Sequence, residues 1–202
     1  MKRLLLIVLP LLLIVGCSKE PINIETTLVE RDGIFYTKDT NKPYSGPVFS
    51  LYEGGEKKSE GNIKDGKGDG KWTLWYENGQ KQSEKTYKDG KEDGLWTYWY
   101  ENGKKSDEET FKDGEKDGLL IYWYENGQKS YEGTFKDGKR DGLGTWWYEN
   151  GRKKIKGINK DGRRDGLWTW WYENGQKKEE VTFKDGEMIS GNTMTKTDLL
   201  KK

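Results

Sequence analysis

The chain has 202 residues, and its 36 basic and 35 acidic side chains leave a formal net charge of +1 at pH 7. The two signs alternate along the chain without a basic block, so the composition does not indicate a nucleic-acid-binding surface. Histidine is absent and there is one cysteine, which excludes a disulfide within the chain and the commonest general acid–base side chain.

Residues 1–16 are predicted to be a signal peptide. Lys2 and Arg3 give a basic start, and an apolar run over residues 4–15 is interrupted only by Pro10. This run is shorter than the about 20 apolar residues that a membrane-spanning helix needs. We therefore expect the segment to direct export and to be removed.

The sequence Ile14-Val15-Gly16-Cys17 resembles the bacterial lipobox. The resemblance implies cleavage before Cys17 and acylation of that cysteine, and more than one acyl chain gives stable anchoring to a membrane. An ordinary signal peptide with an incidental cysteine is the alternative. Ser18 and Lys19 follow, where aspartate tends to retain such lipoproteins at the inner membrane. The pattern predicts a lipid-anchored protein of the bacterial cell envelope, at the outer membrane or cell surface rather than the inner membrane.

The mature chain divides into four predicted segments. Residues 17–26 form a lipidated tether, and residues 27–44 an N-terminal capping hairpin. Residues 45–187 form six 24-residue repeats, and residues 188–202 a polar C-terminal tail. Asp32-Gly33 supplies the turn of the capping hairpin.

The repeats keep their period without an insertion. Tyrosine recurs at Tyr52, Tyr76, Tyr100, Tyr124, Tyr148 and Tyr172, and Asn-Gly recurs at residues 78–79, 102–103, 126–127, 150–151 and 174–175. In a repeat array each unit contacts only its neighbours. The predicted fold is therefore all-β, an elongated single-layer antiparallel meander of repeated β-hairpins without a central cleft.

One unit shows the predicted hairpin. Residues 95–101 alternate as a strand, Asn102-Gly103 is expected to form a two-residue type I′ turn, and residues 104–112 return antiparallel. Residues 113–118 are expected to lead into the next hairpin. Counting outward from the turn gives the cross-strand pairs Tyr100–Lys105, Tyr98–Asp107, Trp96–Glu109 and Gly94–Phe111.

This register divides the aromatic side chains between two faces. Trp96, Tyr98, Tyr100 and Phe111 share one face, because cross-strand partners point to the same side, and Trp99 points to the other.

A known repeat shows the same order of residues. Tyr131-Glu132-Gly133-Thr134-Phe135-Lys136-Asp137-Gly138-Lys139-Arg140-Asp141-Gly142-Leu143-Gly144, followed by Tyr148-Glu149-Asn150-Gly151, resembles the MORN repeat. The resemblance covers about residues 45–187. The period is one residue longer than usual, and Trp or Leu replaces the second glycine of Gly-x-Gly in most units. Both departures resemble a bacterial variant, some members of which are antitoxins of toxin–antitoxin systems. The resemblance implies a β-hairpin array that serves as a scaffold and contact surface.

One tryptophan per repeat is a candidate binding residue. These are Trp75, Trp99, Trp123, Trp147 and Trp171, about 10 Å apart if two strands separate them. Either the rings pack against neighbouring side chains and stabilise the sheet, or they form a ladder that binds sugar rings, choline-like cations or peptide side chains.

No catalytic, cofactor or metal site is predicted. No serine has a recognisable base partner, and the carboxylates repeat with the turns. The turn Asp89-Gly90-Lys91-Glu92-Asp93-Gly94 is similar to a calcium loop but has Lys91 where an oxygen ligand is needed. The predicted function is a non-enzymatic, lipid-anchored protein-interaction scaffold that contacts the membrane through Cys17 and binds a protein partner. A cell-wall or carbohydrate-binding module is the second hypothesis, and an antitoxin-like neutraliser of an envelope toxin the third.

Overall fold

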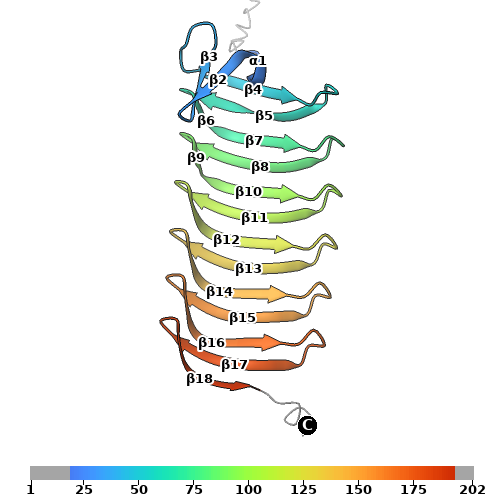
Figure 1. Cartoon of the computed structure of the whole chain (residues 1–202), viewed down its shortest axis with the longest axis vertical. Helices are drawn as coiled ribbons and strands as arrows, with labels where there is room; N and C mark the ends of the chain where they lie inside the picture. Colours follow the sequence, from blue (N-terminus) through green and yellow to red (C-terminus); the bar gives the residue numbers. More distant parts are fainter. Residues whose placement is uncertain (1–18, 194–202) are drawn as a thin grey trace, which may run out of the picture.

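The computed structural model describes residues 19–193, which form one long sheet with a small hairpin at its N-terminal end (Figure 1). The elements are β1 Ile22–Asn23, α1 Ile24–Thr27, β2 Leu28–Arg31, β3 Ile34–Thr37, β4 Gly46–Leu51, β5 Lys57–Lys64, β6 Lys67–Gly68, β7 Gly70–Trp75, β8 Lys81–Lys88, β9 Lys91–Glu92, β10 Gly94–Trp99, β11 Lys105–Lys112, β12 Glu115–Trp123, β13 Lys129–Lys136, β14 Lys139–Trp147, β15 Lys153–Lys160, β16 Arg163–Trp171, β17 Lys177–Lys184 and β18 Glu187–Thr193.

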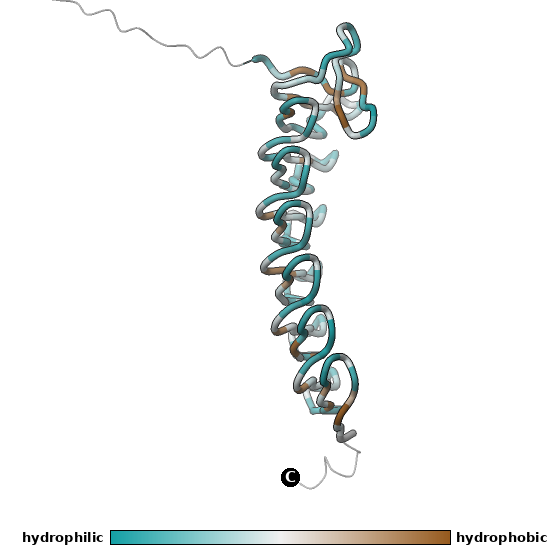
Figure 2. The backbone as a smooth tube through the Cα atoms, turned by 90° about the vertical axis from the view of Figure 1, so that its left-hand side faces the viewer, coloured by the Kyte–Doolittle hydropathy of each residue, from teal (hydrophilic) through white to brown (hydrophobic). Residues whose placement is uncertain are grey.

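The large sheet is a meander in chain order. Its order is β1-β4-β5-β7-β8-β10-β11-β12-β13-β14-β15-β16-β17-β18, with β6 on β5 and β9 on β8. Apart from the parallel pair β1–β4, neighbouring strands in this sheet are antiparallel. Seen from the side, the array is a narrow column in which hydrophilic and hydrophobic segments alternate (Figure 2). The predicted all-β meander of hairpins is confirmed.

The predicted register is confirmed over most of a hairpin but is wrong next to the turn. Gly94 pairs with Phe111, Trp96 with Glu109 and Tyr98 with Asp107, as expected. Trp99 then pairs with Lys105, in place of the expected pair Tyr100–Lys105, because a bulge at Ser106 shifts the register.

The Asn-Gly turn is also longer than predicted. Tyr100 N–H donates to the Lys104 carbonyl at 2.8 Å and Gly103 N–H to the Tyr100 carbonyl at 2.9 Å, which encloses a three-residue loop. Only Gly103 has a positive φ, at 79°, so this is not the type I′ turn, which needs two such residues. Asn102 instead accepts from Lys104 N–H at 3.0 Å through its side chain.

The two-residue turns are formed by Asp-Gly and lie at the other ends of the strands. Asp113 and Gly114 both have positive φ, 52° and 94°, between the paired residues Lys112 and Glu115. β12 therefore begins directly after this turn, where a longer connection was expected. Short turns therefore join consecutive strands of the array at both ends of the strands.

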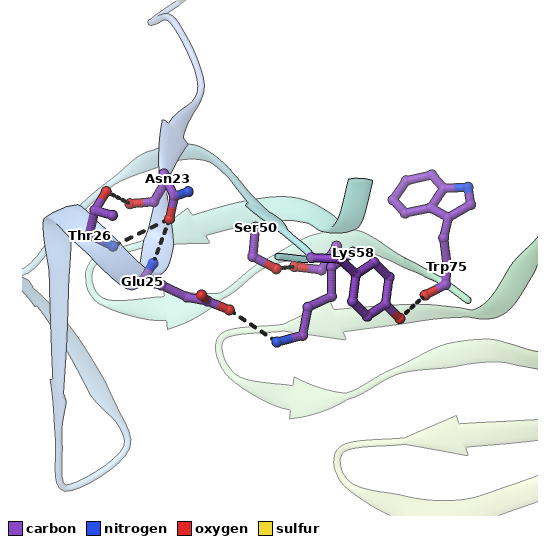
Figure 3. Close-up of polar contacts among 8 residues, drawn as sticks. Asn23, Glu25, Thr26, Ser50, Lys58 and Trp75 are labelled. Atoms are coloured by element: carbon purple, nitrogen blue, oxygen red, sulfur yellow. Dashed lines mark hydrogen bonds and ion pairs between the residues drawn. The ribbon is translucent and has the colours of Figure 1, made fainter. Parts of the chain in front are cut away.

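The N-terminal segment folds onto the first strands. The expected tether, residues 17–26, contains β1 and most of α1, and Ile22 and Ile24 pack on the buried cluster Leu28, Tyr44, Val48 and Ile63. Asn23 caps α1 by accepting from Glu25 N–H at 2.9 Å, and Lys58 pairs with Glu25 at 3.1 Å (Figure 3). β2 and β3 form a separate hairpin around Asp32-Gly33, within the segment expected to cap the array.

The C-terminal end of the array is a further strand. β18 pairs with β17 through residues 187–193, so the first part of the expected tail, residues 188–202, continues the sheet. The remainder of that tail, the signal peptide 1–16 and Cys17 lie outside the described residues. Within residues 19–193 no helix has the length and apolar character needed to cross a membrane.

The core is one face of the sheet, which we call the aromatic face. Ring centroids lie 4.7 Å apart for Trp96 and Phe111, 4.7 Å for Tyr131 and Trp146, and 5.8 Å for Trp146 and Trp168. The last two contacts join neighbouring hairpins, whereas Trp96 and Phe111 belong to the same hairpin. The one-layer array is therefore stabilised by clusters of large rings that reach across neighbouring hairpins.

Candidate functional site

The five candidate tryptophans form a row on the opposite face, which we call the tryptophan-row face. Trp75, Trp99, Trp123, Trp147 and Trp171 each end the first strand of a hairpin, and all five are half-buried. Consecutive members lie two strand steps apart in the sheet, so the strands that carry them are about 9.4–9.8 Å apart. The ring–ring contacts found in residues 19–193 all lie on the aromatic face. The row is therefore not held by stacking between its own rings.

Tyrosine hydroxyls hold the backbone of the row. Tyr52 Oη donates to the Trp75 carbonyl at 2.6 Å, while the Trp75 indole takes no part in this contact (Figure 3). The same bond joins each repeat to the next, from Tyr76 to Trp99 at 2.7 Å, Tyr100 to Trp123 at 2.6 Å, Tyr124 to Trp147 at 2.7 Å and Tyr148 to Trp171 at 2.8 Å. The tyrosine hydroxyls thus link neighbouring hairpins near the Asn-Gly turns. The indole rings take no part in these bonds and are left available to contact a ligand.

Lysine–glutamate pairs accompany the row. Lys57 Nζ lies 5.2 Å from the Trp75 ring centroid and pairs with Glu60 at 2.7 Å. Lys81 Nζ lies 5.8 Å from the centroid of Trp99. The pairs are Lys57–Glu60, Lys81–Glu84, Lys105–Glu108, Lys129–Glu132 and Lys177–Glu180. Each indole therefore has polar groups beside it, as the rim of a protein interface does.

One repeat breaks this charge pattern. Lys156 replaces the glutamate of the other units, beside Lys153. Neither lysine forms an ion pair with any residue of the described chain. The tryptophan-row face therefore has a local excess of positive charge near Trp147 and Trp171.

A row of exposed leucines was not predicted from the sequence. Leu95, Leu119, Leu143 and Leu167 are 54%, 46%, 48% and 54% exposed. They share a face with the tryptophans, because Leu95, Thr97 and Trp99 alternate along one strand, and about 13 Å of strand separates the two rows. Thr97 between them is only 7% exposed. The signal was the same period-two alternation, applied backward from each tryptophan.

The first repeats form a groove on this face. Its volume is about 800 Å³, and its apolar lining includes Pro21, Pro47, Phe49, Leu51 and Trp75. Lys57, Lys71 and Lys81 also line it. Leu51 occupies the position of the tryptophan in the other units, so a smaller side chain leaves space beside Trp75.

The aromatic face is covered by the protein's own charged side chains. Arg164 lies 4.7 Å from the Trp168 ring centroid and 5.1 Å from that of Phe183. Glu109, 9% exposed, accepts from Lys116 at 3.0 Å and from the Tyr122 hydroxyl at 2.9 Å. Burial, with Glu109 as the next contribution, raises the pKa of Tyr98 to about 12. This face is therefore a packed core, whereas the opposite face presents half-buried and exposed apolar groups.

The aspartates of the turns have structural roles. Asp137 N–H donates to Asp117 Oδ2 at 3.4 Å, and Asp161 N–H to Asp141 Oδ2 at 3.2 Å, so one turn is bonded to the next. Within residues 19–193 no cluster of three or more His, Cys, Asp or Glu has a geometry that could hold a metal ion.

Comparison with models of known protein families gives a match over four repeats. A family model described as a MORN repeat variant matches residues 68–89, 92–113, 116–137 and 164–185. The interval between the third and fourth matches holds the unit with Lys156 and with Asn159, which replaces the aromatic residue Phe135 of the preceding repeat. No curated protein matches the chain. MORN repeats generally mediate interactions with proteins or membrane phospholipids, and their all-β fold is typically a non-enzymatic scaffold.

Proposed function

This chain belongs to the MORN-repeat family, and from that premise we propose that it is a non-enzymatic scaffold that binds a protein partner in the bacterial cell envelope. The partner contacts the tryptophan-row face, and lipid on Cys17 holds the protein at the outer membrane or cell surface.

The observation that supports this proposal is the row of half-buried indoles beside exposed leucines. Tryptophan is enriched among the residues that dominate binding energy at protein interfaces, and such residues are surrounded by polar groups that exclude water. Lysine–glutamate pairs supply those polar groups here. Because tyrosines link the hairpins, loss of an indole is expected to affect binding more than folding.

The binding test replaces Trp99, Trp123 and Trp147 together by alanine. The wild-type protein is expected to capture an envelope protein by cross-linking, identified by mass spectrometry, and the variant is expected to lose it while retaining its far-ultraviolet circular dichroism. A matched control replaces Lys88, Lys112 and Lys136 by alanine. These lysines lie beside the Asp-Gly turns, at the other ends of the strands, and this variant is expected to capture the partner as the wild type does. Equal capture by the tryptophan variant would refute the proposal.

A carbohydrate-binding module is the second candidate, favoured by the regular spacing of flat rings along the row. The same proteins distinguish it in a retention assay on peptidoglycan and polysaccharide. Saturable retention of the wild type, lost in a folded triple variant that still captures protein, would assign the row to sugars.

The anchoring test compares the full chain with Cys17→Ala. We expect the wild type in the membrane fraction with a mass gain on residue 17, and the variant in the soluble fraction. Equal distribution of the two proteins would show that Cys17 carries no anchor.

A further inference from the structure

The spacing of the tryptophan row fits one backbone conformation in a ligand. The strands that carry consecutive indoles are about 9.4–9.8 Å apart, because they lie two strand steps apart in the sheet. A polyproline II helix has three residues per turn and rises about 3.1 Å per residue, so every third side chain faces the same way at about 9.3 Å. The heptad of an α-helix advances about 10.5 Å, and a β-strand presents a side chain to the same face every about 6.6 Å. Over the four steps of the row only polyproline II stays in phase to within about 2 Å.

We propose that the tryptophan row binds a proline-rich segment of a partner protein in the polyproline II conformation, with one residue of each triplet against one indole. This inference rests on the proposed function and names the chemical class of the partner. Aromatic side chains bind proline-rich segments in other recognition modules because the ligand is already ordered before it binds.

The groups around each indole fit such a ligand. A polyproline II backbone makes no internal hydrogen bonds, so its carbonyl groups need donors when they leave water. Lysine ammonium groups lie beside the rings, at 5.2 Å for Lys57 and Trp75 and 5.8 Å for Lys81 and Trp99. The short, buried Thr97 next to this row leaves room for a ligand backbone. The strand register places a lysine opposite each of the other three tryptophans, so each repeat offers one ring and one lysine.

Charge and shape distinguish the two ends of the ligand. The excess positive charge of Lys153 and Lys156 calls for acidic residues at one end of the segment. At the other end, the groove of about 800 Å³ between Leu51 and Trp75 accommodates a larger apolar side chain. The partner segment is therefore proline-rich with an acidic terminus, and spans about 15 residues over the five indoles.

The test uses the full-length protein purified in detergent and synthetic peptides of about 15 residues. The first repeats the triplet Pro-Pro-Gln, the second has the same repeat with two glutamates at one end, and the third repeats the quartet Pro-Pro-Gln-Gln. A heptad-repeat amphipathic helix is the fourth. Fluorescence anisotropy of labelled peptides is expected to show saturable binding of both triplet peptides, about tenfold tighter than of the quartet or the helix. Absence of saturable triplet binding, or equal affinity for the quartet, would overturn the proposal.

Two variants locate the binding. Trp99→Ala with Trp123→Ala is expected to weaken triplet binding about tenfold or more, since stacking contributes strongly per ring. Lys156→Glu restores the glutamate of the other repeats and allows a pair with Lys153, so the fold is retained. It is expected to weaken the acidic peptide about threefold to tenfold and to leave the neutral triplet unchanged. Equal effects on both peptides would refute the placement of the acidic end of the ligand beside Lys153 and Lys156.

The outcomes separate this inference from the proposed function. If the tryptophan triple variant loses its envelope partner but wild-type protein ignores the triplet peptides, the scaffold function stands and the proline-rich ligand is wrong. If the triple variant keeps its partner, the proposed function itself fails.

Discussion

Within each repeat, tyrosine and tryptophan differ in what their side chains contact. The Tyr100 hydroxyl bonds the Trp123 carbonyl of the next repeat, whereas the Trp123 ring stays half-buried on the tryptophan-row face. The sequence displays both residues with the same period and predicts that they point to opposite faces, but it does not show what each side chain contacts. Side-chain hydrogen bonds across 23 residues appear only once neighbouring hairpins are placed beside one another.

The tyrosine link is testable by removing one oxygen atom. Tyr100→Phe keeps the ring but leaves the Trp123 carbonyl without this donor, so the free energy of unfolding should fall by about 0.5–1.5 kcal/mol. Urea unfolding followed by circular dichroism measures the change.

Tyr172→Phe is the matched control. Tyr172 occupies the last tyrosine position and is 40% exposed, and within the described residues only the single strand β18 follows its hairpin. Its loss of the hydroxyl should leave the stability unchanged within error. Equal losses for the two variants would show that the hydroxyl bond to the next repeat is not what stabilises the array.

The burial of Tyr98 on the aromatic face predicts a loss of stability at high pH. The pKa of Tyr98 is about 12 in the folded chain, against 10.0 ordinarily, because of burial and then Glu109. Between these values the unfolded chain releases the proton while the folded chain keeps it, so the free energy of unfolding decreases as pH rises.

Urea midpoints measured from pH 9 to pH 12 should therefore fall above about pH 10, and should fall less steeply in Tyr98→Phe. Other tyrosines, including Tyr122, whose pKa is also raised, keep part of the dependence in that variant. A slope identical in wild type and Tyr98→Phe would contradict the assignment.

At the scale of the hairpin, much of the register was predictable. Counting from Asn102-Gly103 gives the correct partners from Tyr98 outward, because two errors cancel. The loop has one residue more than expected, which shifts the register by one residue. The unpaired bulge residue Ser106 shifts it back. Neither feature has a distinct signature in the local residues, since Asn-Gly suits both turns and bulges depend on the twist of the whole sheet.

Glycines beneath tryptophans leave room for the rings on the aromatic face. A Cβ atom at Gly157 would collide with the ring of Trp168, which is 4% exposed and donates from Nε1 to the Ile158 carbonyl at 2.9 Å. Gly157→Ala should therefore displace a buried ring and reduce the free energy of unfolding by about 1–3 kcal/mol. Thermal and urea unfolding measure the loss.

Gly68→Ala provides the comparison. Its nearest neighbour would be Trp72 Nε1 at 3.4 Å, an ordinary contact, and its φ is not positive. A change within about 0.5 kcal/mol is expected. If both glycines tolerated alanine equally, close approach of the ring would not be the reason for glycine at residue 157.

At the scale of the whole molecule, the period of 24 residues predicts an array, but the sequence does not reveal how its ends are built. The N-terminal end is closed by β1, which pairs parallel to β4, and by the cluster around Leu28 and Val48. These contacts join residues distant in the chain and have no period. Only the three-dimensional contacts show that the indoles are free to contact a ligand. The same pattern of tryptophans in the sequence would also fit a row of rings packed against neighbouring side chains.

The strongest test of the array is a deletion that respects its period. Removing residues 118–141 joins Asp117 to Gly142, so Tyr100 meets Trp147 in place of Trp123 and the tyrosine bond is preserved. Each remaining hairpin keeps a neighbour of the same kind. The shortened protein should fold cooperatively with unchanged circular dichroism per residue, and with a somewhat lower melting temperature because one unit and one interface are lost.

Removing residues 118–129 is the contrasting deletion. It joins Asp117 to Ser130, so the first strand of one hairpin is lost and the following return strand, β13, takes its place beside β11. The tyrosine, tryptophan and turn positions then fall opposite the wrong partners, and a shift in register places side chains on the opposite face. This protein should lose its cooperative thermal transition and aggregate, although it retains more residues than the first variant. If both deletions melted alike, stability would not depend on neighbouring repeats in register, and the array model of this molecule would be refuted.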